Sequence, residues 1–514
     1  MTESPEPRSP FATIGLFAGP LVAALVWYFF RGEAADEGRR QVAAAASWII
    51  IWWLTEAIPL AATALLPLVL FPLLKILPAS KVAVHYGDTQ IFLFLGGFLI
   101  ALGVEQCGLH RRIALAIVAA VGESPKRIVL GFVLATGILS MWMSNTATAL
   151  MMMPMAASVM LRSDRGTMNA KHRRHLGLAL MLGVGYAASM GGLATLIGTP
   201  PNIAFKQLYI NSFPDGPNVS FGGWMLLNLP LALALLFFCW LGLVYVLFPL
   251  PATTASADGD TISEERRRLG PMSQAEWRMA IIFIITALLW IFREPVAGFG
   301  WAPALDLARS ANGKTPAMVD DATVSIAMAL VCFLLPKKGW RGPALIDWET
   351  ATRVPWGILI LFGGGLALAD GLSVTHLDAL LGHWLGGLLA GHSDTVVIAA
   401  TTVSMTALTE VASNLSSVQI SMPLLAEAAQ NVPCDPRMLM IPATLSASCG
   451  FMLPVGTAAN AIAYATGRIR MPEMMRAGLL MDAISIVLIV TFVRLLGHAT
   501  LGITSGGLPE WANH

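Results

Sequence analysis

Two pairs of uncharged polar residues interrupt apolar stretches of this chain. They are Ser144-Asn145, followed by Thr146, and Ser413-Asn414, followed by Leu415. A hydroxyl or carboxamide group can turn a donor toward an anion or an acceptor toward a cation without carrying a charge itself. Within a hydrophobic chain, such groups predict a binding site for a small solute at membrane depth, as in a transporter.

Each pair is followed by a Gly-Thr-x-x-Asn segment, at residues 198–202 and 456–460. In the first segment Pro200-Pro201 would break a helix outright. A single Ser-Asn pair would be compatible with ordinary hydrogen bonding between membrane helices. Two pairs that share the same partner segment favour a functional site.

The composition is that of a polytopic membrane protein. Of 514 residues, 56% are hydrophobic and 12% charged, with a mean hydropathy of +0.69, against roughly 25% charged residues in soluble domains. The formal net charge of +1 argues against a nucleic-acid partner. Because the first apolar run is followed by many others, it predicts a retained helix and not a cleaved signal peptide. Runs near the length that crosses a bilayer are 11–30, 42–60, 90–108, 224–248, 277–292, 322–336, 356–372 and 479–496.

Residues of the kind that carry enzymatic or redox chemistry form no recognisable motif. The five cysteines include no C-x-x-C pair, and there is no P-loop, nucleophile elbow or H-E-x-x-H sequence. An intramembrane hydrolase would need a Ser-His, Ser-Lys or paired-Asp arrangement, and no convincing one is present. We therefore expect neither an enzyme nor a cofactor, and no metal other than sodium.

The chain contains one unit twice, in the same order. Leu95-Gly96-Gly97 corresponds to Phe362-Gly363-Gly364, 267 residues later (96 to 363). The Ser-Asn pairs are 269 residues apart (145 to 414), and the Gly-Thr-x-x-Asn asparagines 258 (202 to 460). Such repeats are typical of secondary transporters. We predict repeats at 1–248 and 277–514, joined by a polar solvent loop at 249–276.

Loop charges predict that the two repeats are inserted upside down relative to each other. Short cytoplasmic loops accumulate positive charge. Residues 424–438 carry Arg437, with Glu427 and Asp435. The equivalent loop of the first repeat, 161–175, is strongly basic. The hairpin of the first repeat should therefore open to the cytoplasm, and the hairpin of the second repeat to the outside. The basic residues of the 161–175 loop are Arg162, Arg165, Lys171, Arg173 and Arg174.

The polar interruptions predict two kinds of broken helix. Segments 128–160 and 396–428 are too long for one crossing and carry the Ser-Asn pair near the middle, which predicts re-entrant helical hairpins. Segments 176–208 and 440–467 should be discontinuous helices. Together with the apolar runs they predict an all-α fold of about 11 transmembrane helices and two hairpins.

A broken helix frees N–H groups at one new end and carbonyl groups at the other, so it can hold an anion and a cation together. Four acids in apolar surroundings add candidates, since such groups are costly in lipid. They are Glu56, Glu105, Asp370 and Glu410. For Glu410, pairing at a helix end and a proton or sodium role are equally good hypotheses.

At these residues the chain resembles the divalent anion/sodium symporter family, the sodium-coupled dicarboxylate, citrate and sulfate transporters. The resemblance covers nearly the whole chain and is clearest at 52–59, 94–115, 141–148 and 447–462. The last segment resembles the family signature through Ser448, Phe451, Pro454, Gly456 and Asn460. Ala463 stands where the usual pattern has Val.

The resemblance implies a homodimer in the cell membrane, the inner membrane in a Gram-negative bacterium. Each protomer would have a scaffold part and a mobile transport part that moves as an elevator. Substrate carboxylates would contact Ser144, Asn145, Thr146, Ser413 and Asn414, helped by Thr199 and Thr457. One sodium ion would lie among Ser140, Ser144, Asn145 and Gly198, and a second among Thr409, Ala412, Asn414 and Gly456.

The second motif departs from the usual Ser-Asn-Thr, because Leu415 replaces the threonine.

The free energy of transport favours coupling to at least two sodium ions. Accumulating a dianion tenfold against 100 mV costs roughly 6 kcal/mol, and each sodium entering down a tenfold gradient supplies roughly 3.7. The leading hypothesis is sodium-coupled import of a C4 dicarboxylate such as succinate, malate or fumarate. Sodium-independent exchange, and citrate or sulfate as substrate, are the alternatives; a passive channel is disfavoured by the paired sites.

Overall fold

A computed structural model describes residues 10–30, 37–122, 124–163, 169–251, 265–296, 298–308, 317–432, 434–504 and 507–512, without the side chains of 161–163. Its elements are all helical, apart from two isolated β-bridges, so the predicted all-α class is confirmed. The α-helices are α1 (Pro10–Phe29), α2 (Glu37–Thr55), α3 (Leu60–Thr63), α4 (Leu66–Leu73), α5 (Ala79–Val84), α6 (Thr89–Gln106), α7 (Leu109–Val121), α8 (Pro125–Ser140), α9 (Asn145–Ser163), α10 (Ala170–Gly192), α11 (Pro200–Ser212), α12 (Phe221–Leu241), α14 (Gln274–Ile291), α15 (Trp301–Ala304), α16 (Asp321–Leu334), α17 (Trp348–Ala351), α18 (Trp356–Val374), α19 (Leu377–Leu389), α20 (Asp394–Val411), α21 (Asn414–Asn431), α22 (Arg437–Ala447), α23 (Ala458–Ala465) and α24 (Met471–Leu501). Short 3-10 or π turns are η1 (His85–Gly87), η2 (Gly242–Leu247) and η3 (Glu510–Ala512).

Six helical stretches among the described residues are long and apolar enough to cross a membrane. Three shorter apolar helical stretches, 60–73, 321–334 and 377–389, accompany them. The total of about 11 crossings stays a prediction. The six are Pro10–Phe29, Ala79–Gln106, Phe221–Leu247, Gln274–Ile291, Trp356–Val374 and Met471–Leu501.

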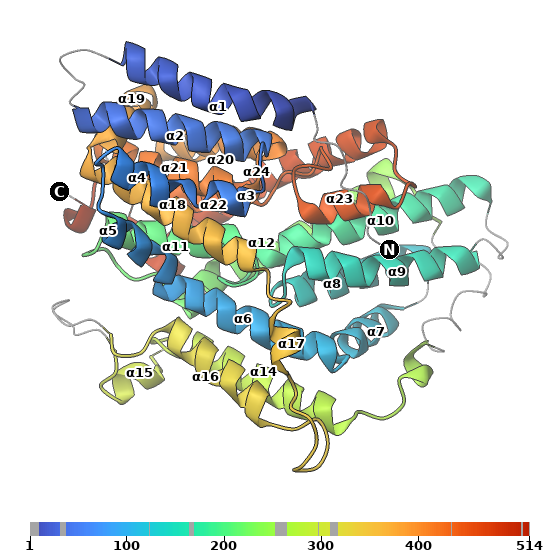
Figure 1. The fold of residues 1–514 in the computed structure, drawn as a ribbon. Coiled ribbons are helices and arrows are strands. Elements are labelled where there is room, and N and C mark those ends of the chain that lie inside the picture. Colours follow the sequence, from blue (N-terminus) through green and yellow to red (C-terminus); the bar gives the residue numbers. More distant parts are fainter. Residues whose placement is uncertain are drawn as a thin grey trace.

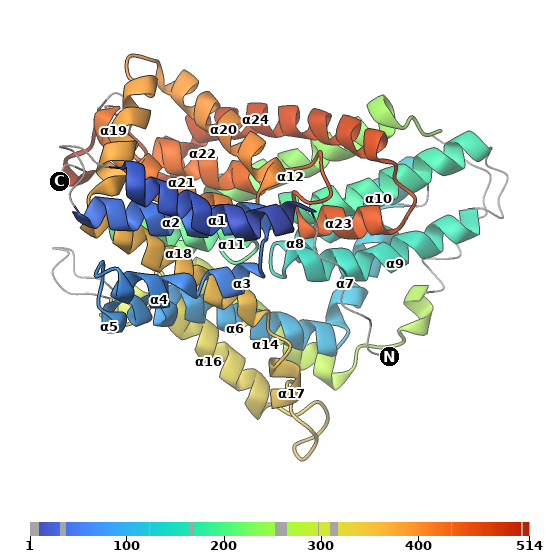
Figure 2. The same ribbon diagram turned by 45° about the horizontal axis from the view of Figure 1, so that its top comes forward.

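The helices stack in layers, as Figure 1 shows. The neighbours α1 and α2 lie side by side along one face, and α14 and α16 lie along the opposite face. Between them α8, α9 and α10 extend toward one end of the molecule. Figure 2 shows that α19 crosses the other helices steeply at the far end, where it packs against α21.

Helices end and begin at the positions predicted from the polar interruptions. The gap between α8 and α9 spans 141–144, and that between α20 and α21 spans 412–413. The second kind of break separates α10 from α11 at 193–199 and α22 from α23 at 448–457. That the hairpins are re-entrant, and that the repeats are inverted, stays a prediction.

The short second piece of each broken helix packs against the opposite half of the chain. Helix α23 contacts α9 and α10, and α11 contacts α21 and α22. The approach is close: a Cβ at Gly185 would lie 3.3 Å from Ala463 Cβ and 3.4 Å from Ala459 O. This crosswise packing brings the two polar interruptions of both halves to one place.

A buried ion cluster attaches α11 to the pair α14 and α16. Asp321, at the start of α16, receives Lys206 Nζ at 2.7 Å on one carboxylate oxygen and Arg293 Nε at 2.6 Å on the other. The Asp321 side chain is 0% exposed and that of Lys206 3%. Within this cluster one carboxylate balances two cations.

Asp435 and Arg437, which we expected in a loop of the second repeat, are buried. Arg437 donates to both carboxylate oxygens of Asp435, at 2.9 and 2.6 Å, and to Leu501 O at 2.6 Å and Gly502 O at 3.1 Å. Their pairing holds the end of α24 against the start of α22. In the first repeat, the side chain of Arg162 and all of Arg165 lie outside the described residues, so the charge comparison between loops stays a prediction.

The polar connection predicted at 249–276 is described only in part, since 252–264 lie outside the described residues. Its later portion is fastened to α7. Arg112 donates to Glu276 Oε1 at 2.7 Å and Gly270 O at 3.0 Å, and Arg111 pairs with Glu265 at 2.5 Å. The described part from 265 to 276 is therefore held against α7, and the solvent loop stays a prediction for the segment as a whole.

We expect Asp321→Asn to lower the stability of the protein strongly. The change leaves Lys206 buried with no counter-charge, while Arg293 keeps only the partly exposed Glu294 at 2.7 Å. Removing one partner of a buried pair costs about 3–5 kcal/mol. Asp394→Asn is the matched control, because the Arg494–Asp394 pair is partly exposed (38% and 27%) and such pairs are worth about 0–1 kcal/mol. Thermal unfolding in detergent measures both. Equal midpoints for the two variants would contradict a structural role of the cluster.

Candidate functional site

Four helix N-termini surround one cavity of about 410 Å³ at the centre of the crosswise packing. They are those of α9 at Asn145, α11 at Pro200, α21 at Asn414 and α23 at Ala458. The structure brings all seven residues predicted for substrate binding to the wall of this cavity. They are Ser144, Asn145, Thr146, Thr199, Ser413, Asn414 and Thr457.

The electrostatics of the cavity come from the backbone. Its described lining includes no lysine or arginine, and the charged group present is the carboxylate of Glu56. The N-termini of α9, α21 and α23 present free N–H groups, whereas α11 begins with Pro200-Pro201, which have none. Each of the four N-termini carries about half a positive charge from the helix dipole. Helices α9, α11, α21 and α23 therefore favour an anion in the cavity.

Behind the first hairpin turn lies a cluster of oxygen atoms. Ser140 Oγ donates to Ala188 O at 2.6 Å and lies 2.8 Å from the Asn145 carboxamide. The inner end of that carboxamide is also 2.9 Å from Ala188 O and 3.3 Å from Gly198 O. Three of these residues, Ser140, Asn145 and Gly198, belong to the predicted first sodium site.

The second hairpin repeats the arrangement almost atom for atom. Thr409 Oγ1 donates to Ala447 O at 2.6 Å and lies 2.9 Å from the Asn414 carboxamide. The inner end of that carboxamide is 3.0 Å from Ala447 O and 2.8 Å from Gly456 O. Ala188 and Ala447, whose carbonyls complete the clusters, were missed by sequence reasoning because a backbone carbonyl has no signal in the residue type.

Each carboxamide can face its cluster in two ways. With nitrogen inward, the amide donates to the surrounding oxygens and the network is satisfied. With oxygen inward, it adds a further oxygen to a group of carbonyl and hydroxyl oxygens, a set that a monovalent cation would hold together. That either cluster binds a sodium ion stays a prediction.

Two predicted sodium ligands have other contacts in the structure. Ser144 Oγ accepts the Ala147 N–H at 3.2 Å, which caps α9. Ala412 ends α20, and its N–H donates to Leu408 O at 3.1 Å. Their part in a cation site stays a prediction.

The asparagine of each Gly-Thr-x-x-Asn segment holds the broken backbone together. Asn202 Nδ2 donates to Gly192 O at 3.1 Å and Thr195 O at 2.7 Å. Asn460 Nδ2 donates to Gly450 O at 2.8 Å and Leu453 O at 3.2 Å. These amides thus tie the two ends of each break together beside the cluster.

Carboxylates support the second break but not the first. Glu410 accepts the N–H groups of Met452 at 2.9 Å and Leu453 at 3.0 Å. Asp482, on α24, accepts the Phe451 N–H at 3.2 Å. Of the two hypotheses for Glu410, pairing with free backbone groups is what the geometry provides.

The other two acids singled out from the sequence have basic partners. Asp370 lies 2.9 Å from His85 Nε2, and Glu105 lies 2.7 Å from Arg353. The second pair borders a cavity of about 520 Å³ that shares Ser144 and Thr146 with the central one. We call this 520 Å³ cavity the vestibule of the central cavity.

His110 also lines the vestibule. Burial lowers the pKa of its imidazole, whose Nδ1 donates to Val104 O at 3.1 Å. The ring is therefore neutral at neutral pH, and Arg353 is the cationic group among the residues described around the vestibule.

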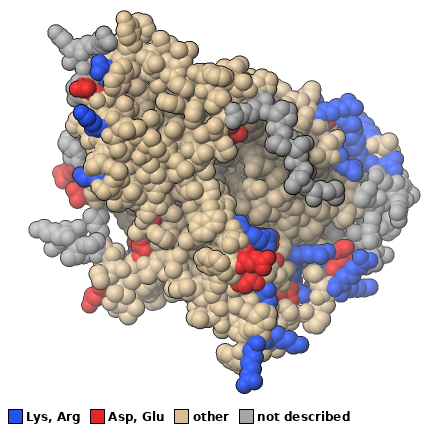
Figure 3. Space-filling model, in the orientation of Figure 1, with Lys and Arg blue, Asp and Glu red and all other residues tan. Residues whose placement is uncertain are grey.

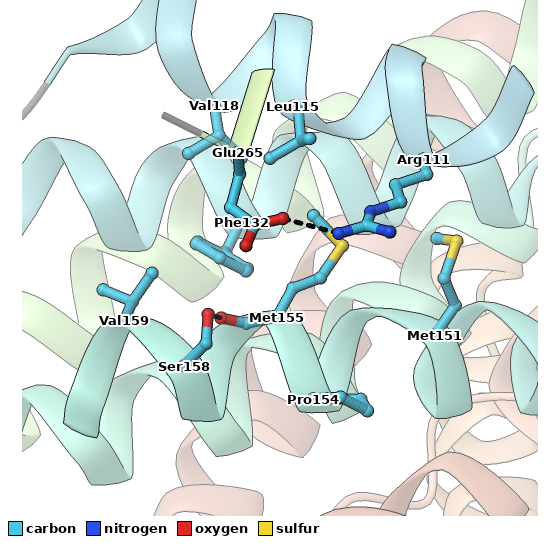
Figure 4. A pocket seen from close by; sticks show the side chains of 10 residues that line it. All are labelled: Arg111, Leu115, Val118, Phe132, Met151, Pro154, Met155, Ser158, Val159 and Glu265. Atoms are coloured by element: carbon cyan, nitrogen blue, oxygen red, sulfur yellow. Dashed lines mark hydrogen bonds and ion pairs between the residues drawn. The ribbon is translucent and has the colours of Figure 1, made fainter. Parts of the chain in front are cut away.

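A further cavity of about 350 Å³ continues along α9 (Figure 4). It separates α9 from α7 and is lined by Met151, Met155 and Ser158, with Arg111 and Glu265 paired across it. Met151 also lines the vestibule. One face of α9 is thus left uncovered from the hairpin turn to Ser158.

The equivalent helix of the second hairpin is covered. A Cβ at Gly386 of α19 would lie 2.6 Å from Asn431 Cβ, so α19 and α21 are in close contact. The 180 Å³ cavity beside this hairpin shares no lining residue with the central one. The central cavity therefore communicates with the vestibule along the first hairpin.

Comparison with known proteins identifies the family. The model of the sodium:sulfate symporter transmembrane region matches residues 14–502. The chain belongs to this family. Sodium-dependent dicarboxylate transporter SdcS of Staphylococcus saprophyticus is 38% identical over 497 residues, 95% of this chain and 92% of its own length. SdcS of Staphylococcus aureus strain MRSA252 is 38% identical over 503 residues, 96% of this chain and 94% of its own.

The family resemblance expected from the sequence is thus confirmed, and the protein is a multi-pass membrane transporter of the cell membrane. Two solved structures share the fold at low identity. MtrF of Neisseria gonorrhoeae, assigned to a class of antimetabolite efflux pumps, aligns with a TM-score of 0.56 at 13% identity over 84% of this chain and 86% of its own. The YdaH transporter of Alcanivorax borkumensis aligns with a TM-score of 0.50 at 14% identity, over 82% of this chain and 88% of its own.

We expect Gly191→Ala to disrupt the first oxygen cluster. A Cβ there would clash with Gly137 O, a backbone atom, so α8 and α10 must move apart, which costs about 1–3 kcal/mol. A bound ion raises the unfolding midpoint, so the sodium-induced shift of that midpoint measures the effect. We expect this shift to be reduced and not abolished, because the second cluster is unchanged. Gly97→Ala is the control, because its nearest neighbour would be Ile197 at 3.9 Å. A normal sodium shift in Gly191→Ala would argue against a cation in this cluster.

Proposed function

We propose that this protein is a sodium-coupled symporter of a divalent organic anion, with a C4 dicarboxylate such as succinate, malate or fumarate as substrate. The observation that carries the proposal is the cavity of about 410 Å³ between four helix N-termini, flanked by two matching oxygen clusters. The printed names of the SdcS relatives, sodium-dependent dicarboxylate transporters, support it.

In this proposal the two ends of the dianion are held unequally. Ser144, Asn145 and Thr146 bind one carboxylate, and Ser413 and Asn414 bind the other. Thr146 is exposed to the cavity, whereas Leu415 at the equivalent position is 4% exposed and offers no hydroxyl. Thr199 and Thr457 complete the walls.

Sodium and substrate are coupled through the two asparagine carboxamides, which border both a cluster and the cavity. A sodium ion in the cluster draws the carboxamide oxygen inward, and the NH₂ group then faces the cavity as a donor to carboxylate. Without sodium the oxygen faces the cavity and repels the anion. Sodium therefore binds first.

We further propose that α8–α11 and α20–α23 form a mobile transport part within each protomer of a homodimer, moving as an elevator. Their crosswise packing supports motion as one unit. The uncovered face of α9 supports a state in which the site is open along the first hairpin, toward the predicted cytoplasmic side (Figure 4).

Transport by purified protein in proteoliposomes tests the function. Uptake of labelled succinate should require an inward sodium gradient and rise with it. Unlabelled malate and fumarate should compete, while citrate and sulfate should compete weakly. Uptake that ignores sodium would establish the exchange alternative, which the neutral residues Ser140, Gly198, Thr409 and Gly456 disfavour. Stronger competition by sulfate or citrate would change the substrate assignment.

Asn145→Ala and Asn414→Ala should each abolish transport in a folded protein.

Asn145→Asp separates the two functions of the carboxamide. It keeps an oxygen toward the cluster but removes the NH₂ donor and adds a negative charge beside the anion. We expect retained sodium-induced stabilisation, and succinate affinity reduced at least tenfold, as expected for loss of a charge-assisted hydrogen bond. Thermal shifts with sodium alone and with sodium plus succinate measure both; an unchanged succinate response would refute the coupling.

A further inference from the structure

A basic cavity of about 600 Å³ lies at the end of the molecule where α9 ends and α10 begins, away from the central site. Four arginines line it: Arg173 and Arg174 from α10, and Arg468 and Arg470 from the segment that joins α23 to α24. Figure 3 shows lysine and arginine side chains gathered at this end of the molecule. The central cavity and its vestibule use none of these residues.

The arginines that we consider as ligands are Arg174, Arg468 and Arg470. Arg174 pairs with Glu473 at 2.5 Å, and Glu473 Oε2 also accepts the Arg470 N–H at 3.0 Å. Arg468 and Arg470 are exposed at the mouth. Guanidinium groups present paired donors that match the oxygens of a phosphate group. The cavity thus suits a phosphate-bearing anion.

The floor of the cavity is apolar, and an apolar surface leads away from it. Met160, Gly177 and Leu178 line the inner wall. From the mouth, α24 runs outward with Met471, Met475 and Leu479 on one face, exposed by 37%, 40% and 60%. These three residues are spaced by four and follow one another along the helix. They offer acyl chains a surface directly beside the arginines.

Charge and apolar surface together point to a lipid and not a soluble metabolite. The loop at 161–175 is basic, which predicts that this end faces the cytoplasm. Anionic phospholipids attract basic groups at that surface. We propose that the cavity binds an anionic phospholipid, with the phosphate between Arg468, Arg470 and Arg174 and the acyl chains along the exposed face of α24.

Such a lipid would join α24 to the outer ends of α9 and α10. Tyr186 of α10 already donates to Met474 O at 3.4 Å, one turn below the mouth. Bound lipid therefore stabilises the contact between α10 and α24, and raises the unfolding midpoint of the full protein.

The test compares phosphatidylglycerol with phosphatidylcholine, each added to delipidated full-length protein, in wild type and in Arg468→Gln/Arg470→Gln. We expect phosphatidylglycerol to raise the unfolding midpoint more than phosphatidylcholine in wild type, and this difference to vanish in the double variant. Native mass spectrometry should show roughly 30-fold weaker phosphatidylglycerol binding, given the surface energy of two arginines.

Matched controls separate this site from general surface charge and from loss of folding. Arg266→Gln/Arg267→Gln removes two exposed arginines of the predicted cytoplasmic side that do not line the cavity, and it should keep the lipid response. Arg468→Lys/Arg470→Lys should keep part of it. A third arm adds sn-glycerol 3-phosphate, a soluble phosphate.

Three results would overturn the proposal. They are a full phosphatidylglycerol response in Arg468→Gln/Arg470→Gln, an equal loss in Arg266→Gln/Arg267→Gln, and an equal response to sn-glycerol 3-phosphate, which would make the ligand a soluble anion. All lipid responses are measured without sodium or dicarboxylate, so the outcome is independent of the proposed transport function.

Discussion

The structure depends on one constraint: eight helix ends meet in the interior, and their free backbone groups need partners. Unsatisfied N–H and carbonyl groups cost several kcal/mol each in a membrane. The carbonyl groups at the ends of α10 and α22 are partly satisfied by Ser140, Thr409, Asn202 and Asn460, through the bonds described above. At the end of α8, Met141 O accepts a hydrogen bond from Thr195 Oγ1. The N-terminal ends of α9, α21 and α23 face the central cavity, where solute or water must complete their free N–H groups. Binding capacity is thus a direct consequence of breaking the helices.

The same constraint explains the crosswise packing and the glycines. Carbonyl groups of one segment reach a neighbouring hairpin only if the backbones approach closely, and Gly191 packs directly on Gly137 O. The second pieces α11 and α23 then have no room beside their own first pieces, and they pack on the opposite half. At the periphery of this centre, Asp321 joins Lys206 of α11 to Arg293.

Sequence reasoning located the breaks because serine, asparagine, glycine and proline are rare inside apolar helices, and their spacing repeats. All seven residues predicted for substrate line one cavity for the same reason. The carbonyls of Ala188 and Ala447 could not be predicted, since their role is set by where a helix ends and not by a side chain. The bond between Lys206 and Asp321 joins residues 115 positions apart, and the burial of Arg437 depends on α24, so neither has a local signal.

The two breaks differ in stiffness, and this difference bears on the direction in which the site opens. In the second half, the carboxyl groups of Glu410 and Asp482 hold three successive N–H groups, from Phe451 to Leu453. In the first half, Met141 stands at the position that corresponds to Glu410. The support there is a neutral hydroxyl, Thr195 Oγ1, which donates to Met141 O at 2.5 Å and accepts the Gly198 N–H at 3.0 Å. Helix α21 is also packed against α19, whereas a cavity separates α9 from α7. The less strongly held break is therefore the one beside which the central cavity is open.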